Sequence, residues 1–298
     1  MQWPRQVLQR RLAIAALIAN AGIAVTGCVV RVTGSGLGCP TWPQCVPGSL
    51  TPVAHPEAAP LHQWIEYGNR MLTVVVGLVV AGSVLAAWGA RRQSPRPLVL
   101  SSVMLGGVVA QAVLGGVTVL TGLSWWTVAA HLLASTALVW LSLLLLDAID
   151  HPASGTRAHP AVAVLFGILV AVLSATLVAG TLVTAAGPHA GSEDTPRLGL
   201  PVEPLAHTHA SLLFLFLGLL IGLGGVLRLR TPDPRIWRRY LLLVGLVLLQ
   251  GGLGLVQFLT GVPATLVALH VLGAMVITAT TASVWCTVHR TPRVAVGS

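Results

Sequence analysis

Eight apolar segments of about twenty residues each constrain what this chain of 298 residues can fold into. An α-helix needs about twenty apolar residues to cross the hydrocarbon core of a bilayer. Helix is the expected spanning form, because it satisfies its backbone polar groups internally. The segments are approximately residues 12–31, 65–88, 98–119, 126–147, 161–184, 206–227, 240–259 and 264–287. The sequence therefore predicts an all-α integral membrane protein with eight transmembrane helices.

The composition agrees with a lipid environment. Hydrophobic residues make up 55% of the chain and charged residues only 8%, which excludes an ordinary soluble domain. The positive side of the net charge of +9 is all arginine, since the chain contains no lysine. These arginines gather in short stretches between apolar segments, so they predict a lipid bilayer as the partner and no nucleic acid.

The distribution of arginine predicts the orientation. All arginines except Arg31, Arg70 and Arg197 fall on one side of the eight segments. The positive-inside rule then places both termini of this multi-pass protein in the cytoplasm, with the cell membrane as its location. Cys39 and Cys45 lie together in a loop on the other side, where a disulfide can persist.

The chain contains an internal repeat. Residues Gln111–Leu133 match Gln250–Leu272 at eleven of twenty-three positions without a gap. Each repeat unit crosses the membrane four times, so the two units have the same orientation. We therefore expect two pseudo-repeated four-helix bundles, formed by residues 1–150 and 151–298.

The other helices of the two halves align more weakly. The first and fifth segments align through Gly27 and Gly180. The second and sixth align loosely, and this places Asn69 on His209. The halves therefore differ at a position where one carries an amide and the other an imidazole.

Histidines inside the helices are the candidate ligands. His131 and His270 are equivalent in the repeat, and His209 begins the sixth segment. At about 1.5 Å per residue, all three lie within roughly 10 Å of the outer helix ends. Histidines that face one another between helices are typical axial ligands of haem iron. We expect His209 and His270 to bind haem. The alternative is that they are hydrogen-bonded core histidines. His207, two residues from His209, lies on a different face of the same helix.

The first half offers a different set of residues. It retains His131, but its second helix carries Glu66 and Asn69 where another ligand would stand. One histidine and a carboxylate suit a site that holds a haem as substrate. Glu66 could accept a proton, or stabilise positive charge that develops on a ring methyl during oxidation.

The carboxylate belongs to a polar stripe at the start of the second helix. His62, Glu66, Asn69 and Arg70 share one helix face. Polar groups at the edge of a membrane helix are costly and favour a functional role. The alternative is an ordinary helix end with a Glu66–Arg70 ion pair.

Four motifs together resemble the haem A synthase family. They are R-V-T-G-S-G-L-G-C-P-T-W-P-Q-C (Arg31–Cys45), I-E-Y-G-N-R (Ile65–Arg70), A-A-H-L-L (Ala129–Leu133) and A-L-H-V-L (Ala268–Leu272). The resemblance covers nearly the whole chain in order. The two cysteines of the first motif match the family's disulfide pair.

The resemblance implies an oxidoreductase that converts haem O into haem A for cytochrome oxidase, through successive hydroxylation of a porphyrin methyl and loss of water. It implies haem b held by His209 and His270, and substrate held near Glu66 and His131. The implied partners are haem O, a haem O synthase (a farnesyltransferase) and an electron donor. A homo-oligomer is left open.

One departure from the family concerns Asn69, where much of the family has histidine. Asparagine is a poor iron ligand, so we expect a five-coordinate substrate iron on His131. The alternative is that His62 supplies the sixth ligand. Two rival functions are a diheme electron-transfer cytochrome, for which Asn69 is a poor fit, and a haem transporter.

Overall fold

The computed structural model describes residues 3–53, 59–92, 94–152, 158–230 and 234–290. All named elements of this part of the chain are helices. They are α1 (Trp3–Val32), α2 (Pro60–Ala90), α3 (Arg96–Leu120), α4 (Trp125–Asp150), α5 (Pro160–Ala186), α6 (Val202–Arg230), α7 (Pro234–Leu259) and α8 (Ala264–Arg290). Every one is long and apolar enough to cross a membrane, which confirms the predicted fold class.

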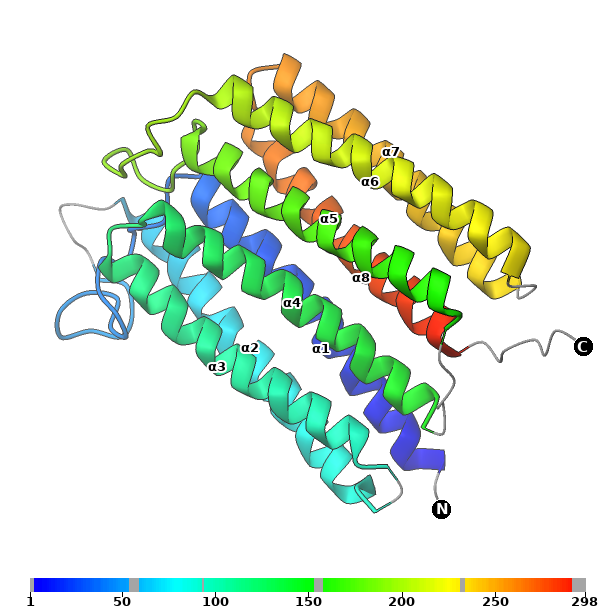
Figure 1. The fold of residues 1–298 in the computed structure, drawn as a ribbon. Helices are drawn as coiled ribbons and strands as arrows, with labels where there is room; N and C mark the ends of the chain where they lie inside the picture. Colours follow the sequence, from blue (N-terminus) through cyan, green and yellow to red (C-terminus); the bar gives the residue numbers. More distant parts are fainter. Residues whose placement is uncertain (1–2, 54–58, 93, 153–157, 231–233, 291–298) are drawn as a thin grey trace, which may run out of the picture.

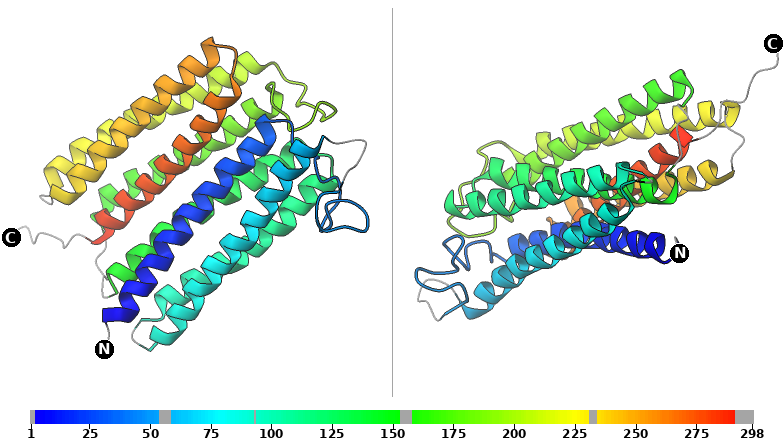
Figure 2. Two further views of the ribbon diagram at one scale, coloured as in Figure 1. Left: turned by 180° about the vertical axis from the view of Figure 1, so that it is seen from behind. Right: turned by 90° about the horizontal axis from the view of Figure 1, so that it is seen from below.

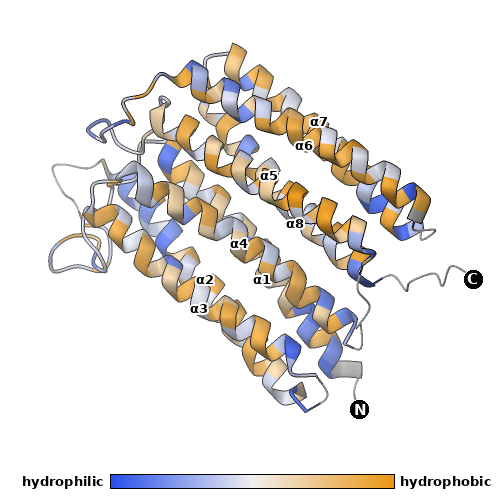
Figure 3. Cartoon of the chain, viewed as in Figure 1, coloured by the Kyte–Doolittle hydropathy of each residue, from blue (hydrophilic) through white to orange (hydrophobic). Residues whose placement is uncertain are grey.

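The helices extend beyond the apolar segments that predict them. The clearest case is α1, which begins at Trp3 and not at residue 12. Polar side chains in this extension form hydrogen bonds to neighbouring helices. Gln9 Nε2 donates to the carbonyl of Ala86 at 3.0 Å. Gln6 Nε2 donates to the carbonyl of Ile149 at 3.2 Å. Figure 3 shows hydrophobic residues along the helices and many hydrophilic ones toward their ends.

Each half of the chain closes into a four-helix bundle. Successive helices pack together, and α1 also contacts α4 while α5 also contacts α8. The first bundle, α1–α4, meets the second bundle, α5–α8, through contacts of α8 with α1 and α4 and of α4 with α5 (Figures 1 and 2). The closing helices of the two bundles therefore lie at the centre of the molecule.

The repeat in sequence is also a repeat in backbone geometry. Leu123 precedes α4 with a φ of 60°, and its counterpart Val262 precedes α8 with a φ of 59°. Such values are uncommon for residues with a branched side chain. Both residues donate a 2.8 Å backbone hydrogen bond to the preceding helix, to Thr118 and Gln257 respectively.

The large core side chains lie toward one end of the bundles, which we call the terminal end because α1 begins there. The opposite end, the loop end, carries the loops between α1 and α2 and between α5 and α6 (Figure 1). The main core of the second bundle includes Phe166, Leu223, Leu243 and Val284, all nearer the terminal end. Toward the loop end, glycines and histidines take the place of bulky core residues.

At the loop end, α1 is bound to the last turn of α5 and to the segment that follows it. Arg31 Nε donates to the carbonyl of His189 at 2.6 Å, and its Nη2 donates to the carbonyl of Thr184 at 2.9 Å. The amide of Gly36 donates to the carbonyl of Gly191 at 2.8 Å. Arg31 therefore holds the two bundles together at this end.

At the terminal end, an ion pair joins the two bundles. Asp147 lies inside α4 and is buried. Its Oδ1 is 2.9 Å from Arg290 Nε on α8, and its Oδ2 is 4.0 Å from Arg96 on α3.

Of the arginines used to predict the orientation, Arg157 and Arg293 lie outside the described residues.

Candidate functional site

Two histidines face one another inside the second bundle. His209 on α6 and His270 on α8 have ring centres 6.2 Å apart and ring planes inclined by 57°. A metal ion shared by two imidazoles separates their ring centres by roughly 6 Å, because each metal–nitrogen bond is about 2 Å. The spacing therefore suits one metal ion between the rings. His207 is exposed and lies near Phe258, at 6.5 Å between ring centres.

A glycine lies behind each of these rings. A Cβ added to Gly180 on α5 would lie 3.0 Å from Cε1 of His209. A Cβ added to Gly254 on α7 would lie 3.1 Å from Cε1 of His270. Both distances are tighter than ordinary van der Waals contact, so the glycines leave room for the imidazoles.

The ring nitrogens are arranged so that the site can accept a ligand. Nδ1 of His209 lies 2.9 Å from the carbonyl of Thr176. Since a carbonyl only accepts, Nδ1 carries the proton and Nε2 keeps a free lone pair. Nδ1 of His270 is buried and has no hydrogen-bond partner in the described part of the chain. A buried polar nitrogen without a partner is uncommon in folded proteins.

The first bundle repeats half of this arrangement. A Cβ added to Gly115 on α3 would lie 3.4 Å from Cε1 of His131, and Nδ1 of His131 is likewise buried without a partner among the described residues. Gln111 donates to the carbonyl of His131 at 2.9 Å, as Gln250 donates to the carbonyl of His270 at 2.8 Å. These glutamines fix the helix turn that carries each histidine.

The other half of the arrangement is different in the first bundle. Asn69 stands beside Gly27, as His209 stands beside Gly180, which supports the loose alignment of α2 with α6. The Asn69 side chain is bonded to Thr26 Oγ1 of α1 at 2.7 Å. The first bundle therefore presents an amide where the second presents an imidazole.

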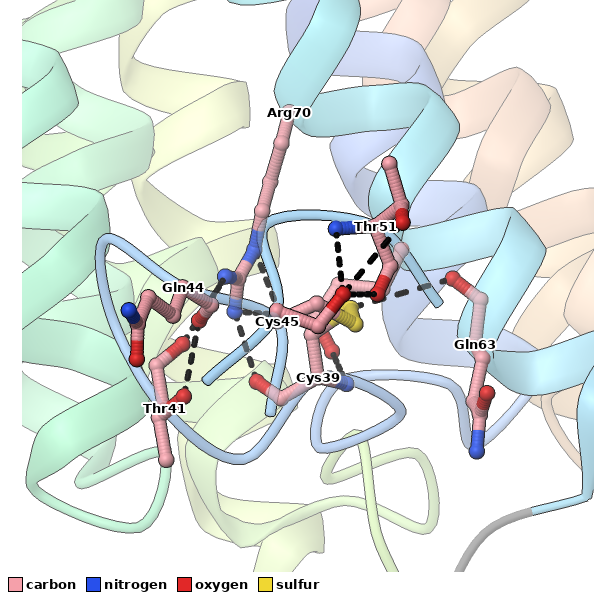
Figure 4. The surroundings of a disulfide bond; sticks show 9 residues. Cys39, Thr41, Gln44, Cys45, Thr51, Gln63 and Arg70 are labelled. Carbon is pink, nitrogen blue, oxygen red and sulfur yellow. Dashed lines mark hydrogen bonds and ion pairs between the residues drawn. A yellow bond between two sulfur atoms is a disulfide. The ribbon is translucent and has the colours of Figure 1, made fainter. Parts of the chain in front are cut away.

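Glu66 is buried and is held from two sides. Its side chain forms an ion pair with Arg70, at 2.5 Å between Oε1 and Nη2, and its Oε2 accepts from the backbone amide of Cys39 at 2.7 Å. Arg70 also donates to the carbonyls of Cys39, Thr41 and Gln44 (Figure 4). The carboxylate points toward the loop between α1 and α2 and not toward lipid. The Glu66–Arg70 ion pair that the sequence suggested as an alternative is present.

The loop over the first bundle is closed by the predicted disulfide between Cys39 and Cys45 (Figure 4). The indole of Trp42 lies against Gly116 of α3, where any Cβ would collide with it. His62 lies in the first turn of α2, and its Nδ1 is 2.8 Å from the hydroxyl of Ser35. The loop therefore engages both ends of the polar stripe on α2.

The structure brings some of the expected site residues together and leaves others apart. His209 and His270 face each other, and Glu66 meets Arg70. Nδ1 of His131 has no hydrogen-bond partner within the described residues, so it does not bond the polar stripe on α2. The sequence alone indicates no role for Thr26 or for the glycines behind the rings, although those glycines recur at equivalent repeat positions.

The fold and the site together define a class: a multi-pass membrane protein of two similar helical bundles, with paired histidines inside the second. The chain belongs to the COX15-CtaA family of cytochrome oxidase assembly proteins, whose family model matches residues 10–199.

Several curated relatives carry the name heme A synthase. The protein of Geobacillus thermodenitrificans is 33% identical over 146 residues, which cover 47% of this chain and 41% of the relative. That of Geobacillus kaustophilus is 31% identical over 109 residues, covering 37% and 32%. That of Brucella anthropi is 25% identical over 328 residues, covering 91% and 89%. The match therefore spans less than half the length of the two Geobacillus relatives.

Proposed function

We propose that this protein is a haem A synthase, an oxidoreductase that converts a ring methyl of haem O into the formyl group of haem A for cytochrome oxidase. Family membership and relatives that carry this name support the proposal. The structural observation that carries it is the 6.2 Å spacing of the His209 and His270 rings, which suits two ligands of one iron.

In this proposal the second bundle, within residues 151–298, holds haem b through His209 and His270. The residues present fit the group, because both rings are backed by glycine and the bond from Nδ1 of His209 to Thr176 leaves its Nε2 lone pair free. A haem with two imidazole ligands exchanges single electrons and has no position left for substrate. The carbonyl of Thr176 fixes the ring of His209 as an outer hydrogen-bond partner.

The first bundle, within residues 1–150, holds haem O as substrate on His131. Asn69 stands in the place of the second imidazole, so the substrate iron is five-coordinate in this account. His62 is the alternative sixth ligand, but its Nδ1 is engaged by Ser35 in the first turn of α2.

Glu66 is the proposed catalytic carboxylate. Arg70 and the amide of Cys39 each bind one of its oxygens, so the group is fixed in place before substrate binds. A fixed negative charge beside a porphyrin edge stabilises positive charge that develops on a ring methyl. The same carboxylate can accept a proton that leaves the methyl carbon.

The proposed setting is the cell membrane, with both termini in the cytoplasm and both haem sites near the outer side. Haem O comes from a haem O synthase, a farnesyltransferase, and an electron donor completes the reaction. The proposal is compatible with a homo-oligomer.

Pigment extraction tests the proposal. Cells that make haem O but lack a haem A synthase of their own are given the gene or an empty vector, and extracted haems are separated by chromatography. The proposal predicts haem A only in cells that carry the gene. Bound haem without any haem A would contradict it and would favour a diheme cytochrome or a haem transporter.

A further inference from the structure

The two bundles differ at a matched pair of positions on neighbouring helices. The repeat that aligns Gly27 with Gly180 also places Thr26 on Ala179, and Asn69 falls on His209. In the first bundle the pair is therefore threonine with asparagine, and in the second it is alanine with histidine. Both pairs lie beside the same glycine position.

In the second bundle, the imidazole of His209 is held by a hydrogen bond to the backbone. Nδ1 of His209 bonds the carbonyl of Thr176 at 2.9 Å, one turn before Ala179. Ala179 is buried and has no polar group that could compete for the ring. The backbone bond leaves Nε2 of His209 free to act as a ligand.

In the first bundle, the amide of Asn69 is held by a hydrogen bond to a side chain. The hydroxyl of Thr26 lies 2.7 Å from Oδ1 of Asn69 and 3.2 Å from the carbonyl of Ile23. A hydroxyl has a single proton, which the shorter contact uses. With Oδ1 occupied as an acceptor, the remaining polar group of Asn69 is its NH₂, which lies 3.8 Å from a Cβ built on Gly27.

We propose that Thr26 is a positioning residue for the site in the first bundle. By holding Oδ1 of Asn69, it makes the amide NH₂ the group presented on the side of the porphyrin opposite His131. The substrate iron then keeps an open position that faces a hydrogen-bond donor, in contrast to the closed pair in the second bundle. This inference rests on the proposed function, because it assumes that haem O binds on His131.

Carbon monoxide bound to reduced haem O in the purified full-length protein tests the inference. Carbon monoxide needs an open iron position, and its stretching frequency falls when a donor points at its oxygen. Thr26→Val replaces the hydroxyl with a methyl of similar size and frees the amide to rotate. We expect a shift of the stretch to higher frequency and a fall in haem A formation of roughly fivefold to tenfold, as for one lost hydrogen bond.

Thr26→Ser retains the hydroxyl and is the matched rescue, so it should keep the wild-type frequency and activity. If Thr26→Val does not accumulate, Thr26→Ala copies the residue that the second bundle already tolerates at Ala179, and it should give the same shift. The low-spin spectrum of the haem in the second bundle reports whether each variant is folded.

An unchanged frequency with unchanged haem A formation in the folded variant would overturn the role of Thr26. The proposed function would survive that result, because wild-type protein would still make haem A. If the proposed function were wrong, the result would differ, because the wild-type protein itself would then make no haem A.

Discussion

Gly180 on α5 lies so close to His209 on α6 that a Cβ at position 180 would come within 3.0 Å of Cε1 of the ring. The same relationship recurs between Gly254 and His270. Each imidazole is therefore positioned by the absence of a side chain on the helix behind it.

Gly180→Leu should remove haem from the second bundle, because a branched side chain would displace the His209 ring. The measurement is the low-spin haem absorbance per purified protein, and we expect it to fall by at least about tenfold. Gly167→Ala on the same helix is the control, since its Cβ would meet no atom within 4 Å. Equal haem content in Gly180→Leu and wild type would mean that this position does not shape the site.

His270→Ala should abolish the low-spin haem b spectrum, because the iron would lose one of its two imidazole ligands. His207→Ala is the matched control, since His207 is exposed and lies two residues from His209 on α6. Absorption spectra of both purified variants check the prediction. A wild-type spectrum from His270→Ala would show that the ligand assignment in the second bundle is wrong.

Glu66→Gln should retain the haem of the second bundle but leave haem O unconverted or stalled at the alcohol. The substitution removes the negative charge and keeps the shape of the side chain, and loss of one such electrostatic group typically lowers the rate by about a hundredfold or more. Glu203→Gln, at the first turn of α6, is the control. Chromatography of extracted haems is the readout, and a normal yield of haem A from Glu66→Gln would refute the role of Glu66.

Asp147→Asn should destabilise the packing of the two bundles. Asp147 is buried, and the substitution would leave Arg290 of α8 without its partner at 2.9 Å. Breaking such a pair costs about 3 kcal/mol. Asp150→Asn tests an exposed pair with Arg10 and should change stability by less than about 1 kcal/mol. Thermal unfolding in detergent measures both, and equal effects would contradict the role of Asp147 in joining the two bundles.

The sequence was sufficient to predict the eight helices, because their apolar lengths match the thickness of a bilayer. It was not sufficient to predict where the helices end. At α1, the polar residues before the apolar segment remain helical because Gln6 and Gln9 find carbonyls on neighbouring helices. Such partners come from tertiary structure and leave no periodic signal in the sequence.

The facing pair of His209 and His270 was predictable because His270 repeats His131 and because His209 lies at a similar depth in the membrane, and both features follow from the sequence. The surroundings of Glu66 were less so. The sequence suggested the partner Arg70, four residues away on the same helix, but the bond from the amide of Cys39 depends on how a distant loop folds back. Thr26 carried no signal in itself and gained meaning only when its counterpart Ala179 was compared with it in three dimensions.

A structure of the purified protein with its haems bound would show directly whether the two bundles hold their porphyrins differently. We expect one porphyrin between His209 and His270, with both rings on its iron. We expect a second porphyrin on His131, with Asn69 on its opposite face and no imidazole from α2 on the iron. Two porphyrins with identical pairs of histidine ligands, or no porphyrin in the first bundle, would contradict it.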